Sequence, residues 1–307
     1  IPRVARHYEQ PFGNSSTVPA WICAERAKDD GIDKLLAGDG GDELFGGNER
    51  YARQLVFERY ELLPQVLRRA ALEPLLGLPG MDRVSLTRKA ASYVQQARMG
   101  LPDRLHSYNL LLRIGANNVL EPAFLDAVDT LQPFAVQRDW WDTIDAPSSL
   151  DRMLAFDWKY TLVDNDLPKV IGATSMAGLD VGFPLLSDER VELATKLPPR
   201  WKLRGRELRW FFKHALRDFL PDAILTKEKH GFGLPFGVWA CTDEGLQTLA
   251  RDTLQSLGRR RLVRGDFLDT LLGEHLPAHP GYYGEMVWIL MMLELWLQAH
   301  APEWRFG

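Results

Sequence analysis

A glycine-rich acidic segment, GDGGDELFGG at residues 38–47, is the feature that most limits what this chain can fold into. The residues that lead into it, IDKLLAG (32–38), are mostly apolar and bounded by glycines, which is typical of a buried strand in a parallel sheet. Residues 44–63 have the composition of a helix, and another helix is expected over 17–30, ending at Gly31. Helix, strand, glycine-rich loop and helix in this order predict an α/β doubly wound unit.

The same segment has the composition of a ligand-binding loop. Three glycines within residues 38–41 let the backbone turn sharply and approach a ligand closely. Asp39, Asp42 and Glu43 place three carboxylates close together, where they repel one another unless a cation lies among them. Ligands of open α/β sheets bind at the carboxyl ends of strands, and Mg²⁺ there prefers one or two carboxylates together with phosphate oxygens. The pattern therefore predicts a binding loop and not a solvated acidic turn.

Beyond about residue 60 the pattern is almost entirely helical. Apolar residues recur at intervals of three and four over 62–78 and 110–129, and prolines divide the region into short helices. Residues 206–220 have a strongly amphipathic pattern that is ended by a proline. Residues 178–187 and 227–239 are expected to be loops, so that 32–38 is the one strand we predict.

Composition excludes several classes of function. A formal net charge of -4 gives no global case for binding nucleic acid, and the basic run 258–265 is expected to be a solvated turn. The apolar run 286–297 is shorter than the roughly 20 residues of a membrane-spanning helix and is expected to be a buried helix. Cys23 and Cys241 show no metal or disulfide pattern and are expected to be reduced packing residues. HLPAH (275–279) is expected to be a loop without a metal, because a proline lies between its histidines.

Six segments, in chain order, resemble motifs of the asparagine synthetase family. They are EQPFGNSSTVP (9–19), AGDGGDELFGG (37–47), SMA (175–177), FPLLSDERVELATKLP (183–198), FFKHALRDFLP (211–221) and KHGFGLPFGVW (229–239). The family carries counterparts such as E-x-P-F-x-(D/N)-x-S-x-x-P, S/A-G-(E/D)-G-(G/A/S)-D-E-(L/I/V)-F-G-G and K-x-G-F-G-x-P. Because the matches run in order across most of the chain, it is identified as a member of that family.

The resemblance implies a fold and an activity. The implied fold is α/β, an adenine-nucleotide α-hydrolase-like (ATP-pyrophosphatase) parallel sheet that is incomplete in this chain, with a large helical remainder. Residues 1–60 would form the nucleotide-site portion and 61–307 the mainly helical portion of the C-terminal part of a synthetase domain. Family members use ATP and Mg²⁺ to adenylate a carboxylate, most commonly aspartate, with release of pyrophosphate. Ammonia from a glutaminase domain then forms the amide, which implies asparagine biosynthesis in the cytoplasm, and a homodimer is compatible with the sequence.

The resemblance also implies roles for particular residues. Asp39 stands where the family places an acid, usually glutamate, beside the adenylate and the incoming amine, and Asp42 corresponds to its Mg²⁺-pyrophosphate aspartate. Cations are expected to face the phosphates from elsewhere, and Arg209 and Lys213 are four residues apart, as on one helix face. The implied catalytic residues are Asp39, Arg209, Lys213 and Lys229. The implied cofactor-binding residues are Gly38, Gly40, Gly41, Asp42 and Glu43, with Asp42 as the metal ligand.

The chain departs from the family pattern at several places. It has no S-G-G-x-D-S phosphate loop and begins with Ile1, so we expect a piece of a longer protein, without the glutaminase domain and its N-terminal cysteine nucleophile. Gly182 and Ser187 replace the arginine and the aspartate of the family's E-x-R-x-P-F-L-D segment. KVIG (169–172) lacks the aspartate of the family's K-V-D, because Gly172 stands there.

These departures leave three hypotheses open. The first is an ATP-dependent amide ligase such as asparagine synthetase. The second is a related amidotransferase or cyclase with another acyl substrate, which Gly182 and Ser187 favour. The third is a non-catalytic paralogue or fragment, which the absent phosphate loop favours.

Overall fold

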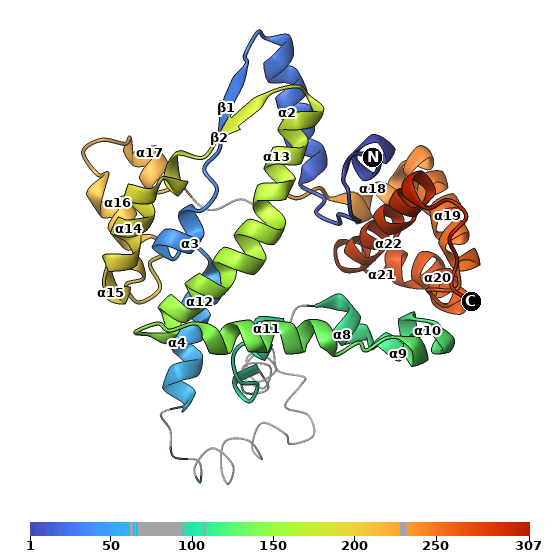
Figure 1. Ribbon diagram of the computed structural model, residues 1–307, viewed down its shortest axis with the longest axis horizontal. Coiled ribbons are helices and arrows are strands. Elements are labelled where there is room, and N and C mark those ends of the chain that lie inside the picture. The colour runs from blue at the N-terminus through green and yellow to red at the C-terminus, as the bar shows by residue number, and fades with distance from the viewer. Residues whose placement is uncertain (62–63, 65, 67–93, 95, 107–108, 228–231) are drawn as a thin grey trace.

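The computed structural model describes residues 1–61, 64, 66, 94, 96–106, 109–227 and 232–307. Within these residues the chain is mostly helical, with one small parallel sheet (Figure 1). The coarse prediction of an α/β chain dominated by helices is therefore confirmed. The helices expected over 62–78 lie almost wholly outside the described residues, whereas those expected over 110–129 are present as three short helices.

The sheet consists of β1 (Lys34–Leu36) and β2 (Asp180–Gly182), which run parallel with Leu35 opposite Val181. The predicted strand at 32–38 is thus confirmed, but its predicted burial is wrong, because Leu36 is 73% exposed. β2 lies in a segment predicted to be a loop. It is three residues long and ends in glycine, so neither its length nor its composition distinguishes it from a loop.

Two helices pack against each other beside this sheet, α2 (Thr17–Asp29) and α13 (Leu167–Met176) (Figure 1). The predicted helix at 17–30 is confirmed, and Gly31 follows it with a φ of 81°, a conformation that favours glycine. α13 continues a long helical segment that begins with α12 (Ser149–Asp157) and passes through the π-helical η4 (Trp158–Asp166). Pro168 at the start of α13 has no N–H to donate. It therefore interrupts the regular helical hydrogen bonds directly after the π-helical turns of η4.

The acidic loop leads into α3 (Gly41–Phe45) and then α4 (Glu49–Glu61). The single helix predicted over 44–63 is therefore interrupted, since Gly46 ends α3 in the left-handed conformation with a φ of 70°. α3 is covered by α14 (Asp188–Lys196) and α16 (Trp210–Ala215). Their shared cluster includes Leu44, Phe45 and Leu197, and the Phe45 ring lies 5.2 Å from that of Phe212.

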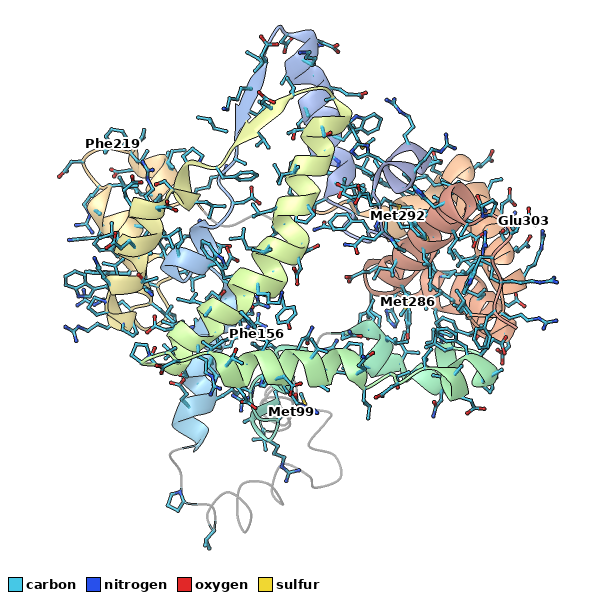
Figure 2. The ribbon with its side chains drawn as sticks, in the orientation of Figure 1. Met99, Phe156, Phe219, Met286, Met292 and Glu303 are labelled. Atoms are coloured by element: carbon cyan, nitrogen blue, oxygen red, sulfur yellow. The ribbon has the colours of Figure 1, made fainter. Side chains whose placement is uncertain are left out.

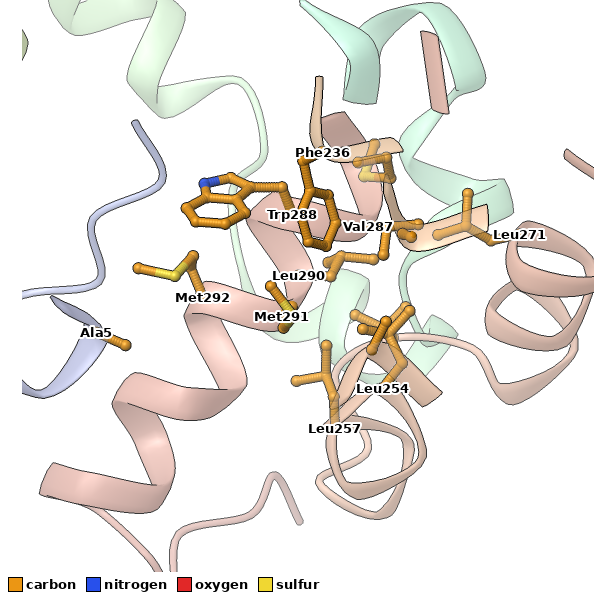
Figure 3. Packing of buried hydrophobic residues seen from close by; sticks show 14 of the residues in the cluster. Ala5, Phe236, Leu254, Leu257, Leu271, Val287, Trp288, Leu290, Met291 and Met292 are labelled. Carbon is orange, nitrogen blue, oxygen red and sulfur yellow. The ribbon is translucent and has the colours of Figure 1, made fainter. Parts of the chain in front are cut away.

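The largest core lies in the C-terminal helices, on the other side of α13 (Figure 1). The predicted buried helix is confirmed as part of α22 (Pro280–His300), which packs against α18 (Phe236–Thr242) and α19 (Glu244–Arg259). Figure 3 shows the side chains of α22, including Trp288 and Met291, gathered with Leu254 of α19. The predicted solvated turn at 258–265 is wrong at Arg260, which is buried and pairs with Glu294 at 2.6 Å.

Three further local predictions are corrected. The amphipathic pattern over 206–220 yields only the short α16, and Phe219 at the edge of the molecule is 80% exposed (Figure 2). HLPAH is helical, because its proline occupies the first turn of α21 (Leu276–Ala278), where a missing N–H is tolerated. Cys23 is exposed and is no packing residue, whereas Cys241 packs against the largest core as predicted.

The remaining elements complete the chain. They are α1 (Pro2–His7), η3 (Asp103–His106), α8 (Leu110–Ile114), α9 (Ala116–Val119), α10 (Pro122–Ala127), α11 (Gln132–Thr143), η5 (Pro184–Leu186), α15 (Pro199–Lys202), α17 (Asp222–Leu225), α20 (Gly265–Thr270) and η6 (Leu271–His275). Among the residues that the structure describes, no helix is long and apolar enough to cross a membrane.

Candidate active site

The acidic loop reaches its conformation because of its glycines. Gly40 immediately precedes α3 with a φ of 89°, and a Cβ there would overlap the side chain of Leu186. A Cβ on Gly41 would approach Leu185 to 3.1 Å. Gly40 therefore requires glycine, Gly41 leaves little room for a side chain, and the loop can lie directly against η5. This close packing fixes where the neighbouring carboxylates point.

A cavity of about 480 Å³ opens at this loop, directly beyond the carboxyl end of β1. Its size is within the range of small-molecule sites. It is lined by Gly38, Asp39, Gly40, Gly41, Asp42, Glu43, Phe45, Asp166, Lys169, Leu185, Arg209 and Phe212. The walls therefore come from the loop, the end of η4, the start of α13 and the residues around η5 and α16.

One side of the cavity carries a chain of charges. The Nζ of Lys169 lies 2.9 Å from Oδ1 of Asp166 and 3.7 Å from Oδ1 of Asp39. Burial raises the pKa of Asp39, and the nearby Lys169 ammonium opposes that rise. A single lysine thus faces two carboxylates that come from parts of the chain far apart in sequence.

A second cation also lines the cavity. Nη1 of Arg209 lies 3.8 Å from Oδ1 of Asp42. Gly47 makes this approach possible, because a Cβ there would overlap the Asp42 carboxylate and come within 3.0 Å of the Arg209 side chain. Arg209 has a φ of 54°, and its buried Nε finds no hydrogen-bond partner among the described residues. A non-glycine residue held in the left-handed region at a cavity wall is a form of strain that recurs at functional sites.

Glu43 forms the most buried acidic part of the wall, with 7% of its surface exposed. Burial first, and then the negative charges of Asp42, Asp157 and Asp166, together raise the pKa of Glu43 to about 7. Its own backbone N–H opposes the rise by hydrogen bonding to the carboxylate. The cavity therefore holds an excess of negative charge that a bound cation would relieve.

A buried network underlies this wall. Asp157, at the end of α12, is 1% exposed and pairs with Arg50 of α4. The Tyr51 hydroxyl donates to Asp157 Oδ2 at 2.5 Å, and Arg50 donates to the Thr161 hydroxyl at 2.9 Å. Burial raises the pKa of Asp157 although Arg50 lowers it, and burial beside that carboxylate raises the pKa of Tyr51 well above its ordinary value. The network ties α4 to the long helical segment at the point where its π-helical turns begin.

The structure gathers most of the residues predicted from sequence. The cavity is lined by Gly38, Asp39, Gly40, Gly41, Asp42, Glu43 and Arg209. Lys213 is not among its lining residues, and Lys229 lies outside the described residues, so their catalytic roles stay predictions. Arg209 and Lys213 do not share a helix face as expected, because Arg209 precedes α16 in a left-handed conformation.

Sequence reasoning missed Asp166, Lys169 and the network around Asp157 as site residues. A signal for Lys169 was present, since it stands at the lysine of the segment that resembles the family's K-V-D. The lysine was not assigned a role, because the segment departs from the family pattern at Gly172. Nothing in the local pattern marks Asp166 or Asp157, because both lie in helical sequence and reach the cavity region only through packing.

The carboxylates of the cavity fit a Mg²⁺ ion that is bound together with phosphates. Among the described residues, no group of three histidine, cysteine or carboxylate side chains is arranged to hold a metal ion. Mg²⁺ bound together with phosphates needs only one or two carboxylates, with phosphate oxygens and water as its other ligands. Asp42 and Glu43, whose pKa is raised, line the cavity side by side in the sequence and could supply these one or two carboxylates.

Comparisons with known proteins give a consistent picture. The chain is 21% identical over 297 residues to "Asparagine synthetase [glutamine-hydrolyzing] 1" of Bacillus subtilis (strain 168), covering 96% of this chain and 45% of that protein. It is 25% identical over 300 residues to proteins named "Putative asparagine synthetase [glutamine-hydrolyzing]" of Mycobacterium bovis and Mycobacterium tuberculosis, covering 96% of this chain and 44% of theirs. The chain thus spans less than half the length of these relatives. No solved structure matches it.

The family comparison covers nearly all of the chain. The family described as asparagine synthase matches residues 1–298, which include the acidic loop, the long helical segment and both cations of the cavity. The chain therefore belongs to the asparagine synthase family.

Proposed function

We propose that this chain is the ATP-using part of an amide-forming ligase. In the full-length protein a carboxylate substrate would be adenylated by ATP with release of pyrophosphate, and ammonia derived from glutamine would displace AMP to form the amide. Family membership and the names of the relatives support this proposal. Asparagine biosynthesis in the cytoplasm, with aspartate as the acid, is the most specific form of it.

The observation that carries the proposal is the arrangement of charges in the cavity. Lys169 and Arg209 both line it, and each faces a carboxylate of the glycine-rich loop, Lys169 that of Asp39 and Arg209 that of Asp42. We expect both cations to turn toward the phosphoryl oxygens of a bound nucleotide, where preorganised positive charge stabilises the charge that develops on departing pyrophosphate. Asp39 and Asp42 hold the two cations in place before the nucleotide arrives.

The acidic residues would have two further tasks. Mg²⁺, when bound, would supply positive charge that stabilises the leaving pyrophosphate, and Asp42 with Glu43 would hold it. Asp39 lies on the Lys169 side of the cavity, where it would orient the incoming amine or accept its proton. The raised pKa of Asp39 favours the second task, because a more basic carboxylate is a better proton acceptor.

A related ligase with another acyl substrate is the second candidate function. Gly182, which replaces the family's arginine, lies at the end of β2, where a Cβ would come within 3.2 Å of Leu36 and 3.4 Å of Lys34. Ser187 accepts a hydrogen bond from Nη1 of Arg190 at 2.9 Å. The second candidate rests on the replacement of the family's arginine and aspartate by Gly182 and Ser187, which favours a substrate other than aspartate.

The proposal is tested by measuring pyrophosphate release from the full-length protein. With ATP, Mg²⁺ and ammonia, we expect release that depends on an added carboxylic acid and that falls roughly 100-fold in Asp42→Asn. Dependence on aspartate would support asparagine synthesis, whereas dependence on another acid would support the second candidate. Absence of acid-dependent release from a protein that binds ATP would contradict the ligase function.

A further inference from the structure

A second cavity, of about 820 Å³, is lined in part by the long helical segment. It is enclosed by residues 10–15, the end of η4, residues 234–238 and the first turns of α22. η4 contributes to both cavities, because Asp164 and Asn165 line the second while the adjacent Asp166 lines the first. The second cavity therefore borders the same helical segment as the candidate active site.

The inner wall of the second cavity is apolar and rigid. Trp288 and Phe236 pack edge to face with ring centroids 5.1 Å apart, and both lie in the core that Figure 3 shows. Trp288 Nε1 donates to the Gly13 carbonyl at 2.9 Å, which fixes the indole against the N-terminal segment. Val238 and Ile289, which also line the cavity, are 48% and 39% exposed. Apolar side chains left open inside a concavity fit the apolar body of a ligand.

The polar lining has one sign of charge. Its carboxylates are Asp164 and Glu285, and no lysine, arginine or histidine belongs to the lining that the structure describes. Asp164 has a distant ion pair, 3.9 Å from Lys159, and Glu285 has no ion pair or side-chain hydrogen bond with a described residue. The first cavity, by contrast, contains its own lysine and arginine beside its acids.

We propose that the second cavity binds a small organic cation, a protonated primary amine with an apolar body. Asp164 and Glu285 would face the ammonium group, and Val238 and Ile289 would cover the body. The one-sign lining disfavours an anion, and the volume is that of a small-molecule site. An amide-forming enzyme consumes an amine, so the ligand of this cavity would be a substrate if the proposed function holds. The binding of an amine to the cavity does not depend on that function.

The test compares two probes of equal shape, phenethylamine and the neutral 2-phenylethanol, by calorimetry on the full chain. We expect the amine to bind about tenfold more tightly than the alcohol, and the double variant Asp164→Asn, Glu285→Gln to lose that difference. Asp269→Asn, at an exposed acid in α20 that does not line this cavity, is the matched control and should bind both probes as the unchanged protein does.

Equal binding of the two probes, absence of amine binding, or retention of the preference in the double variant would overturn the proposal. Circular dichroism of the double variant checks that it is folded, which the exposed positions of its two changes favour. Acid-dependent pyrophosphate release, measured on the full-length protein, separates the two proposals. Amine binding without acid-dependent pyrophosphate release would count against the ligase function alone, and release without amine binding would count against the second site alone.

Discussion

At the scale of single residues, the buried Glu43 of the glycine-rich loop makes the free energy of unfolding depend on pH. Its raised pKa means that the folded chain binds more protons than the unfolded chain between about pH 4.5 and pH 7. The contribution of Glu43 to the free energy of unfolding is therefore present at low pH and is lost as the pH rises through 7. At higher pH the buried charge costs up to about 3 kcal/mol.

Glu43→Gln should remove this cost. Without Mg²⁺, we expect the variant to gain stability over the unchanged chain as the pH rises from 5 to 8, measured by urea unfolding. Glu303→Gln, at an exposed position near the C-terminus, is the control and should show no such trend. A stability difference for Glu43→Gln that stays constant across this range would contradict the burial of an ionisable carboxyl at the cavity.

Gly172, a departure from the family pattern, also has a residue-scale explanation. The Tyr8 hydroxyl donates to the Lys169 carbonyl at 3.2 Å, and its ring occupies the space that a side chain at residue 172 would need. Gly172→Ala should therefore destabilise the chain by about 1–3 kcal/mol through overpacking. Gly273→Ala, in a helical segment where a Cβ meets nothing within 4 Å, should be neutral or stabilising. Equal thermal stability of the two variants would show that Tyr8 yields easily.

At the scale of elements, local patterns identify the longer helices well and their interruptions poorly. The helical composition of residues 17–30 predicts α2, and the apolar run 286–297 predicts part of α22. Tertiary contacts reinforce the local preference in both helices. The amphipathic pattern over 206–220 fails because Arg209 adopts a left-handed conformation where the cavity requires it. β2 is not predictable, since three residues paired with a distant strand carry no periodic signal.

The left-handed start of α16 gives a prediction at this scale. Arg209→Gly and Arg209→Ala both remove the cation, but glycine accepts a φ of 54° without strain. We expect Arg209→Gly to be the more stable of the two by about 1 kcal/mol in thermal unfolding. Both variants should bind pyrophosphate more weakly than the unchanged chain. Greater stability of the alanine variant would contradict the backbone conformation at Arg209.

At the scale of the whole molecule, the candidate site is assembled from segments that are far apart in the chain. The glycine-rich loop supplies Asp39 and Asp42, and its role could be predicted because its composition is unusual. Asp166 and Lys169 lie in ordinary helical sequence more than 100 residues later, and only the packing of the long helical segment brings them to the loop. Sequence therefore predicts the part of the cavity that the glycine-rich loop forms better than the part that the long helical segment forms.

Lys169 is the residue that we expect to serve the nucleotide chemistry of this cavity most directly. The most direct test is the rate of acid-dependent pyrophosphate release by the full-length protein carrying Lys169→Gln, with Lys196→Gln, an exposed lysine of α14, as the matched control. We predict that Lys169→Gln lowers the rate roughly 100-fold while Lys196→Gln leaves it unchanged. Equal rates for the two variants would contradict a role of Lys169 in pyrophosphate release.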